Sequence, residues 1–217
     1  IAISTVSETD TAAVTLKVNG SSANFSGITT SNIDTLTITA AGSAFPVSII
    51  GTAGNDILIG SNGADVLVGG AGNDIIMGGL GANRLTGGLG QDIFVINDAD
   101  SPLRGSATEF LAAANTITDF VAGTDKLKLG VAATNSNAVF STNAVSSFTE
   151  ALAAADAAFS SETSPFPFVP VQTREYFVVS DSQNTYVFID NGANGDTADQ
   201  LVVLSGTVTL SAVDIIA

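Results

Sequence analysis

A nine-residue repeat runs without a gap through residues 51–95 and constrains the fold more than any other feature. Its five units read GTAGNDILI, GSNGADVLV, GGAGNDIIM, GGLGANRLT and GGLGQDIFV. Glycine fills positions 1 and 4, a large apolar residue fills position 8, and aspartate fills position 6 in every unit but the fourth, which has Asn83. A flexible glycine-rich linker would not carry phased apolar residues, so we interpret the repeat as folded structure.

The repeat predicts a tight turn followed by a short strand. Glycines in the turn permit positive φ angles and close backbone contact, and the alternation of strand side chains points position 8 inward and positions 7 and 9 outward. Two units would form one coil of a right-handed parallel roll, with coils about 4.8 Å apart. We therefore expect a mainly β protein, a parallel β-roll or β-solenoid capped by a C-terminal β-rich segment with one helix.

Stacking of the coils would place carboxylates above one another. Asp56, Asp74 and Asp92 would align along one edge of the roll, and Asp65 and Asn83 along the other. Two bare carboxylates about 5 Å apart repel by roughly 3 kcal/mol at an effective dielectric constant near 20, so the stack needs a cation between coils. Calcium accepts many oxygen ligands in flexible geometry, whereas magnesium requires a stricter octahedral geometry. Zinc prefers His and Cys ligands, which this chain lacks.

We predict two good calcium sites, one between Asp56 and Asp74 and one between Asp74 and Asp92. The site between Asp65 and Asn83 keeps only one carboxylate and should be weaker or lost. Turn carbonyls can supply the remaining oxygen ligands. The repeat glycines at these turns are Gly51, Gly54, Gly60, Gly63, Gly69, Gly72, Gly78, Gly81, Gly87 and Gly90.

The outward positions of the first, third and fifth units are all apolar. A sheet face made of such residues should not face water. We expect the C-terminal third of the chain or a neighbouring molecule to cover it. The residues are Ile57, Ile59, Ile75, Met77, Ile93 and Val95.

The flanking sequence divides into three further regions. Residues 1–50 carry short alternating runs of Ser, Thr, Val and Ile, and we expect solenoid coils without the calcium consensus; an independent small β-domain is the alternative. Residues 96–130 contain NTITDFVAGTDKLKL, which is placed to cap the open end of the roll. Its Asp119 and Asp125 are either calcium ligands or ordinary turn and cap residues.

Residues 131–217 are expected to form a C-terminal β-rich module. Apolar residues at helical spacing predict a helix near 146–160, and strands are expected at 175–180, 185–190 and 200–206. The acidic loop 190–199 partly resembles a calcium loop, but it departs from the EF-hand pattern and has no glutamate at position 12, so a hairpin loop is the simpler interpretation.

Charge and motif content narrow the possible functions. The net charge is −15, which disfavours binding to nucleic acid or to an anionic membrane surface. No apolar run reaches the roughly eighteen residues of a membrane span. The sequence contains no H-E-x-x-H, G-x-S-x-G or Walker motif, so we expect no enzyme within it. The chain opens at Ile1 without a basic signal-peptide region, so we expect a fragment or a processed product.

The five units resemble the RTX (repeats-in-toxin) family of calcium-binding β-rolls. Segment 117–129, ITDFVAGTDKLKL, resembles the part that closes the roll in that family's secreted proteins. Four other segments resemble bacterial surface-layer (S-layer) proteins of RTX type: NFSGITTSNIDTLTITA, FTEALAAADAAF, YFVVSDSQNTYVFIDNG and DQLVVLSGTVTLSAVDI.

This resemblance implies a calcium-dependent structural protein of the bacterial cell surface that self-associates into a lattice. It also implies secretion by type I machinery through an uncleaved signal near the C-terminus. The family's calcium ligands map onto Asp56, Asp65, Asp74 and Asp92, and Asn83 departs from the pattern. The alternative is the C-terminal folding and export module of a secreted adhesin, protease or lipase. An enzyme tail should follow a catalytic fold, whereas residues 1–50 predict more strands.

Overall fold

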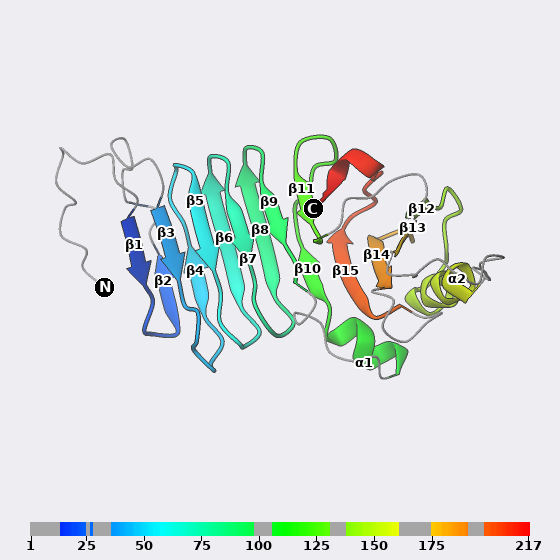
Figure 1. Ribbon diagram of the computed structural model, residues 1–217, viewed down its shortest axis with the longest axis horizontal. Coiled ribbons are helices and arrows are strands. Elements are labelled where there is room, and N and C mark those ends of the chain that lie inside the picture. The colour runs from blue at the N-terminus through cyan, green and yellow to red at the C-terminus, as the bar shows by residue number, and fades with distance from the viewer. Residues whose placement is uncertain are drawn as a thin grey trace, which may run out of the picture.

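The structure is a computed structural model of the 217-residue chain. It describes residues 14–24, 27, 36–97, 106–130, 138–160, 175–190 and 198–217. Within these residues two β-sheets enclose one core, and the stacked coils run from the N-terminal part to a helix-bearing C-terminal part (Figure 1).

One sheet, called here the odd sheet, consists of strands that all pair in parallel. In spatial order its strands are β1 (Val14–Lys17), β3 (Leu36–Thr39), β5 (Asp56–Ile59), β7 (Ile75–Met77), β9 (Ile93–Val95), β11 (Lys126–Lys128) and β16 (Ile215–Ile216).

The other sheet, the even sheet, begins with parallel strands, continues as an antiparallel meander of three strands, and ends with a strand that pairs in parallel with the meander. Its parallel part is β2 (Ser22–Asn24), β4 (Ser48–Ile50), β6 (Val66–Ala71), β8 (Arg84–Leu89) and β10 (Asn115–Ile117). Beyond β10 it continues with β15 (Gln200–Ser205), β14 (Asn184–Asp190), β13 (Glu175–Ser180) and β12 (Ala138–Phe140).

Strand register confirms the predicted β-roll. Ile57 pairs with Ile75, and Ile75 pairs with Ile93, so each unit lies against the second unit after it. The even strands follow the same rule, because Val66 pairs with Arg84. Strands β1 to β4 extend both sheets on the N-terminal side of the repeats.

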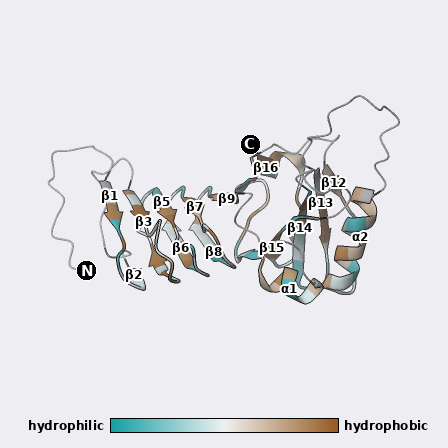
Figure 2. Ribbon diagram, turned by 60° about the horizontal axis from the view of Figure 1, so that its bottom comes forward, coloured by the Kyte–Doolittle hydropathy of each residue, from teal (hydrophilic) through white to brown (hydrophobic). Residues whose placement is uncertain are grey.

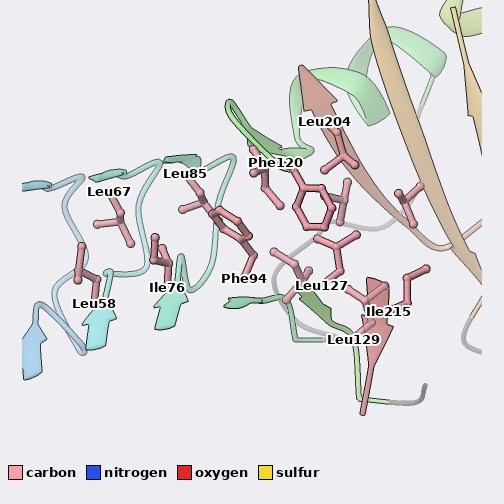
Figure 3. Packing of buried hydrophobic residues seen from close by; sticks show 14 of the residues in the cluster. Leu58, Leu67, Ile76, Leu85, Phe94, Phe120, Leu127, Leu129, Leu204 and Ile215 are labelled. Atoms are coloured by element: carbon pink, nitrogen blue, oxygen red, sulfur yellow. The ribbon is translucent and has the colours of Figure 1, made fainter. Parts of the chain in front are cut away.

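The core of the roll is a column of position-8 side chains (Figure 3). Leu58, Leu67, Ile76, Leu85 and Phe94 are completely buried and alternate between the two sheets. The column continues into the following coil and the C-terminal strands, where the Phe94 and Phe120 rings lie 6.1 Å apart between centroids. The apolar residues that extend it there are Ile117, Leu127, Leu129, Leu204 and Ile215.

A second core joins two helices to the meander. Helix α2 (Phe148–Ser160) buries Leu152, Ala155 and Phe159. Helix α1 (Ala107–Ala112) was not anticipated; it starts at a capping box in which Ser106 and Glu109 bond each other's backbone N–H groups. The two helices and strands β13 to β15 enclose this cluster, which includes Phe110, Phe177, Phe188 and Leu201.

The described residues of the C-terminal third do not supply the expected cover for the apolar face of the odd sheet. Its described elements lie beyond the end of the roll (Figures 1 and 2). The reason is strand pairing, because β15 adds to β10 and β16 adds to β11. The outward side chains of β5, β7 and β9 are half-buried in the described structure, shielded by one another.

Some sequence predictions lie outside the described residues. Residues 191–197, which include most of the acidic loop, are among them, as are 1–13 and 28–35. No helix in the described ranges has the length and apolar character needed to cross a membrane.

Candidate metal-binding edges of the roll

The turns that lead into the odd sheet, called here the odd edge, carry a column of buried aspartates. The Asp56 N–H donates to Asp74 Oδ1 at 2.8 Å, and the Asp74 N–H donates to Asp92 Oδ1 at 2.9 Å. The Asp92 N–H in turn donates to Asp125 Oδ1 at 3.0 Å. These four residues are at most 3% exposed. The structure therefore brings the predicted trio together and adds Asp125 to the column.

Two carboxylate oxygens on this edge have no hydrogen-bond partner. They are Asp56 Oδ1 and Asp74 Oδ2, and both are buried. A buried oxygen without a partner destabilises a fold by about 1–3 kcal/mol, and more when it carries charge. Most buried polar atoms in native proteins are paired, so these two oxygens stand out as acceptors with lone pairs open to a cation.

The electrostatics of the column point the same way. Burial raises the pKa of Asp74 from 3.8 to about 7; the Asp56 N–H opposes the rise, and the Asp56 and Asp92 charges add to it. Burial also raises the pKa of Asp56 and of Asp92. Without a cation, this edge therefore holds carboxylates where their charged form is disfavoured.

Glycine is required where the turns of successive coils touch. A Cβ atom on Gly51 would overlap the Gly69 carbonyl oxygen and lie 2.7 Å from Asp56 Oδ2. A Cβ atom on Gly69 would overlap Asp74 Oδ2 and lie 2.6 Å from the Gly87 carbonyl oxygen. Main-chain oxygens therefore lie beside the aspartate oxygens, in a space that only glycine leaves open.

This donor set fits a hard divalent cation. Within the described residues, no three acidic side chains gather at one point. A metal ion on the odd edge would therefore take oxygens from two aspartates of successive coils and from turn carbonyls such as those of Gly69 and Gly87. Calcium accepts such a set of carboxylate and carbonyl oxygens, whereas zinc favours nitrogen and sulfur ligands.

The turns that lead into the even sheet, the even edge, are built differently. Asp65 Oδ1 accepts from the Val47 N–H at 2.7 Å, and Ser61 donates through its N–H to Oδ2 and through its hydroxyl to Oδ1. Above it, the Asp65 N–H donates to Asn83 Oδ1 at 2.9 Å, and the Asn83 N–H donates to Asn115 Oδ1 at 3.2 Å. This column has one carboxylate, and both of its oxygens are paired.

The remaining predicted residues occupy the turns. Asp119 accepts from the Gly87 and Gly88 N–H groups at 2.9 and 2.8 Å, so it serves as a turn acceptor. The position-1 glycines are buried between coils, and the position-4 glycines lie nearer the surface. The former are Gly51, Gly60, Gly69, Gly78 and Gly87; the latter are Gly54, Gly63, Gly72, Gly81 and Gly90.

Two polar residues of this region were missed in the sequence. Asn115 extends the even column, and a comparison of 115-NTIT-118 with 83-NRLT-86 would have indicated it. Asp214 joins the C-terminal strand to the roll by accepting from the Gly123 N–H at 2.7 Å and the Ser211 N–H at 2.9 Å; Lys126 Nζ is 3.5 Å away. Burial raises the pKa of Asp214, but these hydrogen bonds and the Lys126 charge outweigh it and lower the pKa overall.

Comparison with known proteins supports the repeat assignment. Residues 39–67, 48–76 and 59–94 match the family described as RTX calcium-binding nonapeptide repeat (4 copies). Two similar solved structures are the AlgE6R3 and AlgE6R2 subunits of the mannuronan C5-epimerase of Azotobacter vinelandii. They are 23% and 28% identical, each with a TM-score of 0.46; the match covers 81% of this chain and 80% and 89% of theirs. No curated protein sequence matches the chain. The chain therefore carries RTX calcium-binding nonapeptide repeats, folded as a parallel β-roll.

Proposed function

We propose that the odd edge binds calcium in a stack and that this binding drives folding of the module. The observation that carries the proposal is the column of buried aspartates with partnerless oxygens on Asp56 and Asp74. One ion would lie between Asp56 and Asp74 and one between Asp74 and Asp92. The continuation of the column to Asp125 supports a further ion between Asp92 and Asp125.

Calcium would supply the positive charge that the carboxylate column lacks. At low calcium, as in a cytosol, the carboxylates repel and their burial opposes formation of the roll. At the millimolar calcium found outside cells, the binding free energy adds to the folding free energy. The module would thus stay unfolded during export and fold on arrival.

Circular dichroism with and without a chelator tests this function. We expect the β signal of the full chain to fall when EDTA removes calcium and to return when calcium is added in excess. Magnesium at the same concentration is the control, and it should restore less of the signal because it demands stricter geometry. An unchanged β spectrum after chelation would show that calcium does not drive folding.

We further propose that the protein is a structural component of a bacterial cell surface, exported by type I machinery and assembled into an S-layer lattice. The resemblance of the flanking segments supports this setting. The described strands β1 to β4 add to it, because they continue the roll ahead of the repeats instead of forming a separate fold.

Electron microscopy of the full-length protein in millimolar calcium distinguishes this setting from its alternative. Ordered two-dimensional sheets that disperse on chelation are the expected result. Dispersed particles at all calcium concentrations would favour a folding and export module of a secreted adhesin or enzyme.

A further inference from the structure

The side chain of Asn83 lies inside a cluster of oxygen atoms on the even edge. Its Nδ2 is 3.0 Å from the Gly79 carbonyl oxygen, 3.4 Å from that of Leu80 and 3.1 Å from that of Gly81. Asn115 Oδ1, from the next coil, lies 2.9 Å away. Four oxygens, three of them from one turn, therefore surround a single donor nitrogen, and Asn83 is 1% exposed.

The orientation of this amide follows from its neighbours. Asn83 Oδ1 accepts from the Asp65 N–H at 2.9 Å, which requires the oxygen to face that backbone group. A reversed amide would set its NH₂ group against the Asp65 N–H and its oxygen against the carbonyl cluster. The hydrogen-bond network therefore places the NH₂ group among the oxygens.

Unit 4 differs here from units 1 and 2, which have Thr52 and Ser61 at position 2 where unit 4 has Gly79. In unit 3, which also has glycine at position 2, Asp74 Oδ2 has no hydrogen-bond partner. In units 1 and 2 the position-6 carboxylate accepts from the N–H of position 2, at 2.6 Å for Thr52 and 2.5 Å for Ser61. In unit 4 the equivalent side chain donates to the carbonyl of position 2, Gly79. The polarity of the contact is reversed, and the turn now presents its oxygens to the side chain.

We propose that the Asn83 NH₂ group takes the place of a cation between the unit-4 turn and Asn115 of the next coil. This layer of the even edge is then held together without metal. The inference rests on the proposed calcium function of the odd edge and deepens it. The amide hydrogens carry partial positive charge and bond the oxygens that would otherwise need an ion. The layer joins β8 to β10, and β10 pairs with β15, so the junction of the roll with the C-terminal meander is held independently of calcium.

Calcium counting on three full-length variants tests the proposal. Asn83→Asp replaces the NH₂ group by a carboxylate oxygen within the same cluster, and equilibrium dialysis should show one more bound calcium than in the wild type. Asn83→Ala removes the donor without adding charge and should leave the count unchanged. Asn62→Asp is the matched control, because it adds the same charge at an exposed residue of the neighbouring even turn, and it should also leave the count unchanged.

Two results would overturn the proposal. The first is an Asn83→Asp protein that folds and gains no ion, because the cluster would then not form a cation site. The second is loss of one ion from Asn83→Ala, because Asn83 would then be a calcium ligand in the wild type. If Asn83→Asp fails to fold, the number of calcium ions bound by Asn83→Ala becomes the test, and loss of one ion from that variant overturns the proposal. A wild type that binds no calcium would refute the proposed function alone, since Asn83→Asp would still be expected to gain one ion.

Discussion

The odd and even edges of the roll follow the same backbone path, yet they place different side chains at position 6. The odd edge stacks Asp56, Asp74, Asp92 and Asp125, and two of its buried oxygens have no partner. The even edge stacks Asp65 beneath Asn83 and Asn115, and the oxygens of Asp65 are paired. Amide groups at Asn83 and Asn115 thus distinguish the even edge, which carries its own donor, from the odd edge, which we propose to bind a cation.

The largest expected difference between the edges concerns Asp74. This residue has an aspartate in the coil on either side, so Asp74→Ala should disrupt two calcium sites at once. We expect the calcium concentration at the midpoint of folding, followed by circular dichroism, to rise at least tenfold. Asp65→Ala is the matched even-edge variant, and its midpoint should move much less. Equal shifts for the two variants would remove the distinction between the edges.

Glycine replacements sharpen the comparison at one position of the turn. Gly69→Ala on the odd edge would overlap Asp74 Oδ2, and Gly78→Ala on the even edge would place Cβ 2.5 Å from Asn83 Nδ2. Each overlap should lower the free energy of unfolding at saturating calcium by about 1–3 kcal/mol or more. Only Gly69→Ala should also weaken calcium binding. Gly20→Ala is the control, because no atom lies within 4 Å of its Cβ position.

The pH dependence of the calcium-free protein should come from the odd edge. Because burial first, and the neighbouring charges with it, raises the Asp74 pKa from 3.8 to about 7, the folded state binds a proton that the unfolded state releases. This stabilisation is complete below pH 3.8 and is lost as the pH rises through 7. Residual β structure in EDTA, measured by circular dichroism, should therefore increase on acidification from pH 8 to pH 5.

Two comparisons identify the source of that dependence. Asp74→Asn should reduce it and leave the contributions of Asp56 and Asp92, whose pKa values burial also raises, whereas the amides of Asn83 and Asn115 do not titrate and cannot produce it. In calcium the sign should reverse, because protons compete with the ion for the carboxylates. Calcium-free β structure that is constant, or that grows with rising pH, would contradict this account of the odd edge.

The smallest expected effect belongs to Ser61 on the even edge. Its hydroxyl donates to Asp65 Oδ1 at 2.7 Å, so Ser61→Ala leaves that oxygen with one donor fewer. We expect a loss of about 1 kcal/mol in chemical denaturation at saturating calcium, without a change in the number of bound ions. A lost ion would show that the even edge binds calcium near Asp65.

The regular spacing of the repeat explains what the sequence could predict. An interval of 18 residues defines the coil, so the inward Leu58 and the alignment of Asp56 with Asp74 follow from the pattern alone. The next interval is 33 residues from Asp92 to Asp125 and 32 from Asn83 to Asn115, because a segment that contains α1 intervenes. A fixed period therefore could not find the continuation of either column.

Other features of the fold and of the site depend on contacts between residues far apart in the sequence. Asp119 and Asp125 look equivalent in the sequence, but the stacking gives the first to the Gly87 turn and the second to the aspartate column. The C-terminal strands extend the two sheets, instead of covering the apolar face of the odd sheet, because β15 pairs with β10 and β16 pairs with β11. Helix α1 was predictable in principle, because 106-SATE-109 has the form of a capping box.

An X-ray structure from crystals grown in millimolar calcium, with an anomalous-scattering map, tests the contrast between the edges most directly. We expect calcium peaks on the odd edge, between Asp56 and Asp74, between Asp74 and Asp92 and between Asp92 and Asp125, and no peak beside Asn83 Nδ2. An odd edge without calcium, or an ion within the Asn83 oxygen cluster, would contradict this expectation.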